Sequence, residues 1–77
     1  MNNQELLSLV KNYAAQLRSF ELCKGTAGKL MNIAVASARL AVAREITLAS
    51  AGVKFADVEL AEYEGFQMAE EFELNNH

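Results

Sequence analysis

The two most chemically versatile side chains, cysteine and histidine, each occur once, as Cys23 and His77. A structural zinc site takes about four nitrogen or sulfur ligands, so this pair is too small a set. A thiol nucleophile needs a positioned base, and the single histidine, at the last position, does not supply one. The helix end expected near Cys23 also disfavours a thiolate. We therefore expect Cys23 to be a reduced, non-catalytic thiol, with no disulfide within the chain.

Pairs of carboxylates are the next candidates for acid–base or metal chemistry, at Glu59 and Glu62 and at Glu70 and Glu71. Di-iron helical bundles combine such glutamates with Glu-x-x-His motifs on facing helices, and no histidine falls within an expected helix here. The ligand spacing of a calcium loop is also missing. The sequence therefore predicts neither a metal site nor any other cofactor.

The segment 25–30, Gly-Thr-Ala-Gly-Lys-Leu, partly matches a phosphate-binding loop in front of a helix. The full pattern needs a glycine, four further residues and then Gly-Lys-Ser/Thr. Cys23 stands where the first glycine belongs, and Leu30 replaces the hydroxyl that binds magnesium. We therefore do not expect nucleotide hydrolysis, and together with the two preceding results this predicts that the protein is not an enzyme.

The elements that carry these residues are expected to be helices, because the 77 residues include no proline and 52% of them are hydrophobic. This length allows a single domain. The first helix is predicted over 3–24, with Asn2 as its N-cap three residues before Glu5 and Gly25 as the left-handed residue after its end. Its apolar side consists of Leu6, Val10, Tyr13, Leu17 and Phe20.

A second helix is predicted over 27–49, with Thr26 as its N-cap. One apolar track along it consists of Met31, Val35, Ala38, Val42 and Ile46. A second apolar track consists of Leu30, Ile33, Ala34, Leu40 and Ala41. The most polar track is narrow and consists of Lys29, Asn32, Ala36, Arg39 and Ala43. A helix that is apolar over most of its circumference is packed on more than one side, so we predict that this is the central helix of the fold.

A third helix is predicted over 55–73, where good helix formers dominate, although Gly65 could interrupt it. Its expected core side consists of Val58, Ala61, Gly65, Met68, Ala69 and Phe72. The predicted fold is thus all-α: a small bundle of two long helices and a shorter, acidic C-terminal helix. A chain of this size buries only about 60% of its unfolded surface, so we expect homodimerisation to complete the bundle.

Charge is unevenly distributed, with a net charge of +3 over residues 1–53 and −6 over residues 54–77. Aromatic side chains lie within the acidic stripe of the third helix, where they could anchor a basic protein surface that the carboxylates attract. This candidate partner-binding set consists of Phe55, Glu59, Glu62, Tyr63, Phe66, Glu70 and Glu73. Two simpler interpretations stay open: the stripe is only a solvated face, and Phe66 packs against the first helix or against a second copy.

Nucleic-acid binding is the alternative, through a basic edge of the second helix. The residues that would form this edge are Lys24, Lys29, Arg39 and Arg44. A sequence pI of about 5.0 is the opposite of the basic footprint of nucleic-acid binders. The overall charge therefore disfavours this alternative.

The resulting hypothesis is a non-enzymatic interaction protein that binds and regulates or inhibits a larger partner, such as a nucleic-acid-processing complex. Small acidic proteins suit roles as inhibitors, adaptors or nucleic-acid mimics, including accessory proteins of phages and mobile elements. A purely structural oligomer subunit is a further alternative. We expect a cytoplasmic protein without a membrane partner, because the sequence shows neither a basic-then-apolar leader nor roughly 20 consecutive apolar residues.

Overall fold

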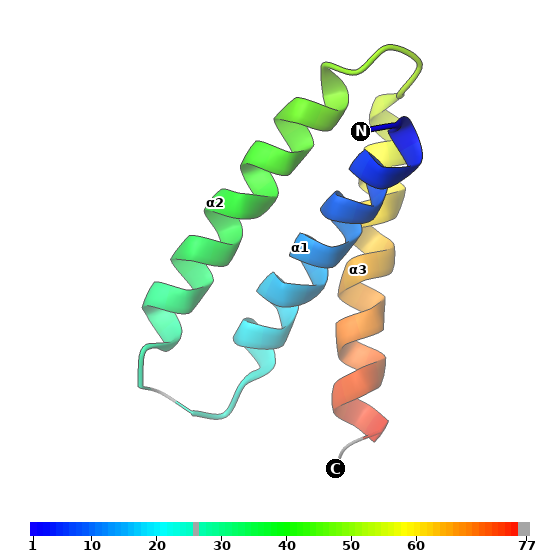
Figure 1. The fold of residues 1–77 in the computed structure, drawn as a ribbon. Coiled ribbons are helices and arrows are strands. Elements are labelled where there is room, and N and C mark those ends of the chain that lie inside the picture. Colours follow the sequence, from blue (N-terminus) through cyan, green and yellow to red (C-terminus); the bar gives the residue numbers. More distant parts are fainter. Residues whose placement is uncertain (26, 76–77) are drawn as a thin grey trace.

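The computed structural model describes residues 1–25 and 27–75, and within these residues it contains three α-helices and no strand (Figure 1). They are α1 (Asn3–Leu22), α2 (Lys29–Leu48) and α3 (Phe55–Asn75). The all-α prediction is confirmed. The prediction of a shorter third helix is wrong, because α3 has 21 residues against 20 in each of the others. Gly65 does not interrupt α3.

The two ends of α1 show one correct and one incorrect prediction. The side chain of Asn2 accepts a hydrogen bond of 2.8 Å from the backbone N–H of Glu5, which confirms the N-cap. The helix ends at Leu22, and Cys23 continues in an extended conformation. Gly25 is not left-handed, so the predicted glycine cap is wrong. The Cys23 carbonyl instead accepts a hydrogen bond of 2.9 Å from Nζ of Lys29, which satisfies this end of α1 from the next helix.

The start of α2 lies two residues later than predicted. Gly28 is its N-cap residue, with a φ of 70° that glycine adopts without strain. Because this left-handed conformation is not that of an α-helix, the helix begins only at Lys29. A residue with a side chain would be disfavoured at position 28. Thr26, the predicted N-cap, lies outside the described residues.

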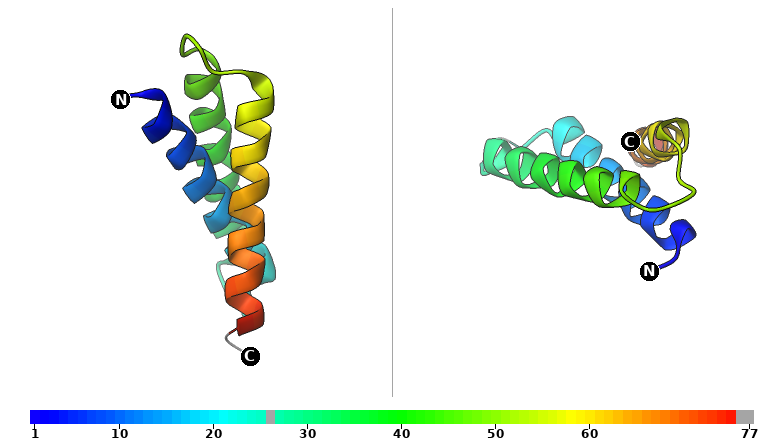
Figure 2. Two further views of the ribbon diagram at one scale, coloured as in Figure 1. Left: turned by 90° about the vertical axis from the view of Figure 1, so that its right-hand side faces the viewer. Right: turned by 90° about the horizontal axis from the view of Figure 1, so that it is seen from above.

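The central helix is α1, not α2 as predicted. It packs against both neighbours along its length, whereas α2 and α3 hardly contact one another. Figures 1 and 2 show α2 and α3 close together at their connection and diverging toward the opposite end of the molecule. The apolar circumference of α2 therefore does not reflect packing on several sides within this chain.

The core is built mainly from small side chains of all three helices. Its buried cluster consists of Val10, Ala14, Leu40, Ala43, Val58 and Ala61. On α2 the buried residues are Ala36, Leu40, Ala43 and Thr47. Ala36 and Ala43 belong to the track that we predicted to be the most polar, so that prediction is wrong. Their small side chains allow α2 to approach α1 closely, which a row of valines or isoleucines would prevent.

The contact between α3 and α1 is closer still. Gly65 faces α1, and a Cβ atom at this position would collide with the carbonyl oxygen of Lys11 and lie 2.8 Å from the Cβ of Ala14. Met68 and Phe72 were predicted to be core residues, but they are 42% and 63% exposed. Ala69, next to Met68, is only 3% exposed, so this part of α3 still packs on α1, and Met68 and Phe72 lie to the side of that contact. The diverging helix α2 does not cover that side (Figure 1).

A polar cluster fastens the connection between α2 and α3 to the start of α1. The amide of Asn3 donates to the carbonyl of Ala51 at 3.0 Å, and the hydroxyl of Ser50 donates to the amide oxygen of Asn3 at 2.7 Å. The buried hydroxyl of Thr47 donates to the carbonyl of Ala43 at 2.7 Å and lies 3.4 Å from the carbonyl of Leu6. These contacts fix the end of the molecule where the three helices are closest.

Candidate interaction surfaces

The acidic stripe of α3 is partly occupied by contacts within the chain. A carboxylate oxygen of Glu70 lies 3.2 Å from Nε of Arg18, and one of Glu62 lies 3.6 Å from Nε of Arg44. The guanidinium of Arg18 also covers the ring of Phe66, 4.9 Å from its centroid. The first interpretation of Phe66 that we left open, packing against the first helix, therefore describes its position, because its partly buried ring lies between the core and Arg18.

These two arginines also hold the α3 stripe in place. The Nε atoms of Arg18 and Arg44 are buried, and neither makes an aligned hydrogen bond. Their compensation is the nearby carboxylate charge, at distances at which the ion pair remains favourable even without ideal alignment. Glu62 and Glu70 are therefore structural partners of these arginines.

Three residues of the predicted set face outward without such an ion pair. Phe55, Glu59 and Tyr63 follow one another at intervals of four residues and are all exposed. They thus form one line along α3, which we name the α3 ridge. The hydroxyl of Tyr63 accepts a hydrogen bond of 3.1 Å from Gln67, which holds its ring along the helix surface. The ridge combines two exposed aromatic rings, 55% and 58% accessible, with a carboxylate between them.

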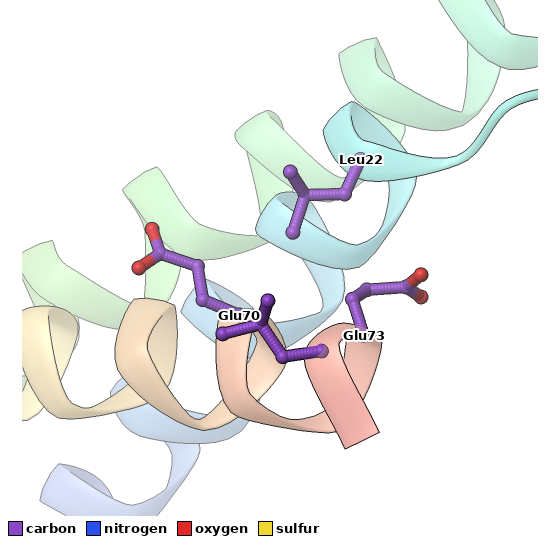
Figure 3. A pocket seen from close by; sticks show the side chains of 4 residues that line it. Leu22, Glu70 and Glu73 are labelled. Atoms are coloured by element: carbon purple, nitrogen blue, oxygen red, sulfur yellow. The ribbon is translucent and has the colours of Figure 1, made fainter. Parts of the chain in front are cut away.

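Glu73, the last member of the set, lines a shallow pocket at the open end of the molecule. Leu22 of α1 reaches toward this pocket, which is completed by Glu70 and Leu74 of α3. Figure 3 shows the carboxylates of Glu70 and Glu73 pointing to opposite sides, away from Leu22. Since its two acidic groups do not converge on one point, this pocket does not present a pair of carboxylates for acid–base catalysis.

The basic residues of the alternative nucleic-acid site do not form one edge. Lys29 donates its amine to the Cys23 carbonyl, and Arg44 is paired with Glu62 on the side that faces α3. Arg39 is exposed and lies beside the groove between α1 and α2, well apart from Arg44 around the helix. Lys24 is exposed in the connection after α1. The structure therefore does not bring the four cations together.

The predicted metal-ligating and thiol positions can be located in the described part of the chain. Residues 1–25 and 27–75 contain no group of three or more histidine, cysteine, aspartate or glutamate side chains placed to hold a metal ion. Cys23 is a free, exposed thiol. Among the same residues, no helix combines the length and apolar character that crossing a membrane requires.

A further apolar surface lies outside the candidate site that the sequence predicted. It is the outer face of α2, which consists of Met31, Val35, Ala38, Val42 and Ile46 and is exposed throughout. Leu9 and Tyr13 of α1 extend it into a groove beside Ala38, Val42 and Ile46. The sequence did show this track, which we assigned to the packing of a central helix or, in the structural-oligomer alternative, to contact with a second copy. The signal that could have identified it is that its side chains are larger than those of the opposite, alanine-rich track.

Comparisons with models of protein families, with curated proteins and with solved structures found nothing that matches this chain.

Proposed function

We propose that the protein is a non-enzymatic interaction module that docks a larger protein through α3 and regulates or blocks it. The observation that carries this proposal is the α3 ridge of Phe55, Glu59 and Tyr63. Two exposed aromatic rings flanking a carboxylate provide apolar anchors next to a charge that attracts a basic surface. The net charge of −6 over residues 54–77 favours such a partner through long-range attraction.

The ion pairs of Glu62 and Glu70 narrow the proposal to the α3 ridge. Because these carboxylates compensate buried arginine atoms, reversing their charge would disturb the fold as well as the surface. The test therefore uses Phe55→Ala, Glu59→Lys and Tyr63→Ala together. Glu71→Lys is the matched control, since it makes the same charge change at an exposed position of α3 outside the ridge.

The first step of the test is affinity capture of the tagged protein from a native lysate of its source, with and without nuclease. The expected result is a stoichiometric protein partner that survives nuclease. In the second step, the purified partner should bind the wild type and the Glu71→Lys variant with equal affinity. Its affinity for the triple variant should be lower by at least about a hundredfold. Equal binding of the triple variant would show that the α3 ridge is only a solvated surface.

Nucleic acid is the competing result of the same experiment. Partners that disappear after nuclease, with retention on DNA or RNA that weakens as salt rises, would favour the nucleic-acid alternative. In that case Arg39→Gln should reduce retention and the triple variant of the α3 ridge should not.

A further inference from the structure

The outer face of α2 holds larger apolar side chains than the inner face that packs on α1. Met31 is 69% exposed, Val35 40%, and Val42 and Ile46 55% each. Among the buried residues of the inner face, Leu40 is the one large apolar side chain, beside two alanines and Thr47. Contiguous apolar surface of this kind marks a place where another protein binds. The identity of its occupant can be inferred from the order of the residues.

The apolar residues of this face are arranged symmetrically about its centre. From the point between Ala38 and Arg39, Val35 and Val42 lie equally far in the two directions, and so do Met31 and Ile46. A two-fold dimer needs a surface in which residue i contacts j and j contacts i. An antiparallel pair of α2 helices meets this condition, because each Val35 then faces Val42 of the partner subunit and each Met31 faces Ile46 of the partner subunit.

Size and charge also favour a second copy over an acidic or basic protein. Ala38 is the smallest member and lies at the centre, where two crossing helices come closest. Residues on this face and its borders include two exposed charges, Arg39 and Glu45, whereas α3 exposes five, Asp57, Glu59, Glu64, Glu70 and Glu71. Because α3 packs on α1 and hardly contacts α2, pairing through the outer face of α2 keeps the two acidic α3 helices on the outside and limits their repulsion.

We propose that two copies of this chain associate through the outer faces of their α2 helices, packed antiparallel about a two-fold axis between Ala38 and Arg39. Leu9 and Tyr13 of each α1 border the contact, so that α1 and α2 of both copies form a four-helix arrangement. The α3 ridge lies on a different helix and stays accessible in this dimer. The inference is therefore independent of the proposed function.

The arrangement of the two helices is tested by cross-linking in a Cys23→Ser background, which removes the native exposed thiol. Single variants Val35→Cys and Val42→Cys are purified separately, mixed and oxidised. The antiparallel pairing predicts that the mixture forms disulfide-linked dimers containing one chain of each kind, because these positions face each other within the Cα distance of about 4.4–6.8 Å that a disulfide needs. Each variant alone should cross-link poorly.

A control position is available on the same helix. Leu30 is 84% exposed but lies well to the side of the outer face, so Leu30→Cys should not cross-link with itself or with either variant. Efficient cross-linking of Val35→Cys with itself would indicate a parallel pair and overturn the proposal.

The existence of the dimer is tested by sedimentation and light scattering of the purified protein without any partner. The wild type should have twice the mass of one chain at micromolar concentration. Val42→Lys should weaken self-association by at least about a hundredfold, since each copy would place a charge in an apolar contact. Leu30→Lys should leave it unchanged, and circular dichroism should show equal helix content in both variants. A wild type that remains monomeric up to hundreds of micromolar overturns the proposal.

Discussion

The two helices that flank α1 use the same kind of inner face but very different outer ones. On α3 the buried residues are Val58, Ala61, Gly65 and Ala69, and on α2 they are Ala36, Leu40, Ala43 and Thr47. Both inner faces are thus rich in small residues that allow close packing. Outward, α3 displays a row of carboxylates among its apolar side chains, whereas α2 displays mainly methionine, valine and isoleucine. The comparison shows that the exposed apolar side chains of α3 are interspersed with charges, whereas those on the outer face of α2 form a nearly uncharged surface.

The strongest test of this comparison is Gly65→Leu on the inner face of α3. There is no space for a side chain between α3 and the backbone of α1 at Lys11, so the helices must separate. We expect a loss of stability at or above the upper end of the range of about 1–3 kcal/mol for overpacking, measured by urea denaturation. If the Gly65→Leu variant were as stable as the wild type, the two helices could separate at no cost and their close packing would not be essential.

The second test removes the one large apolar side chain among the buried residues of α2. Leu40→Ala should lower the free energy of unfolding by about 2–4 kcal/mol, because Leu40 is only 5% exposed and contributes to the common core. Urea denaturation followed by circular dichroism measures this change. A loss below about 1 kcal/mol would indicate that α2 is held by its polar contacts at Thr47 and Ser50 rather than by packing.

The smallest effect is expected on the outer face of α2, one residue away from a buried position. Val42→Ser should change the stability of the dilute monomer by no more than about 0.5 kcal/mol, since the side chain is 55% exposed and serine and valine have similar helix propensities. Ala43→Ser is the matched comparison, because it places a hydroxyl in a site that is 6% exposed and should cost more. Equal losses in the two variants would contradict the assignment of opposite faces.

The sequence was sufficient to predict the helices because their signals are local. The N-cap at Asn2 depends on Glu5 three residues later, and helix formers dominate residues 55–75. The arrangement of the helices was not predictable in the same way. Ala36 and Ala43 share a track with Lys29 and Arg39 and so resemble solvated positions in the sequence. They are buried because their small side chains allow α2 to approach α1 closely.

The sequence predicted which residues belong to the candidate site, but not which of them are left free of contacts within the chain. The acidic residues and aromatic rings of α3 are all present as the pattern indicated. Nothing in the spacing along α3 could show that Arg18 of another helix covers Phe66 and pairs with Glu70, because these contacts join residues far apart in the sequence. The α3 ridge therefore remains as the exposed part of that prediction that makes neither of these contacts.

The central position of α1 has a consequence for synthesis of the chain. The helix that contacts both others is the first to be translated, and its most extensive contact is with α3, the last. At about 5–20 residues per second, the roughly 50 residues that follow α1 take several seconds to synthesise. During that interval the backbone of Lys11 and the side chain of Ala14 lack the neighbour that covers them. A chain that stops before residue 55 should therefore present an exposed apolar surface to chaperones, and completion of α3 removes it.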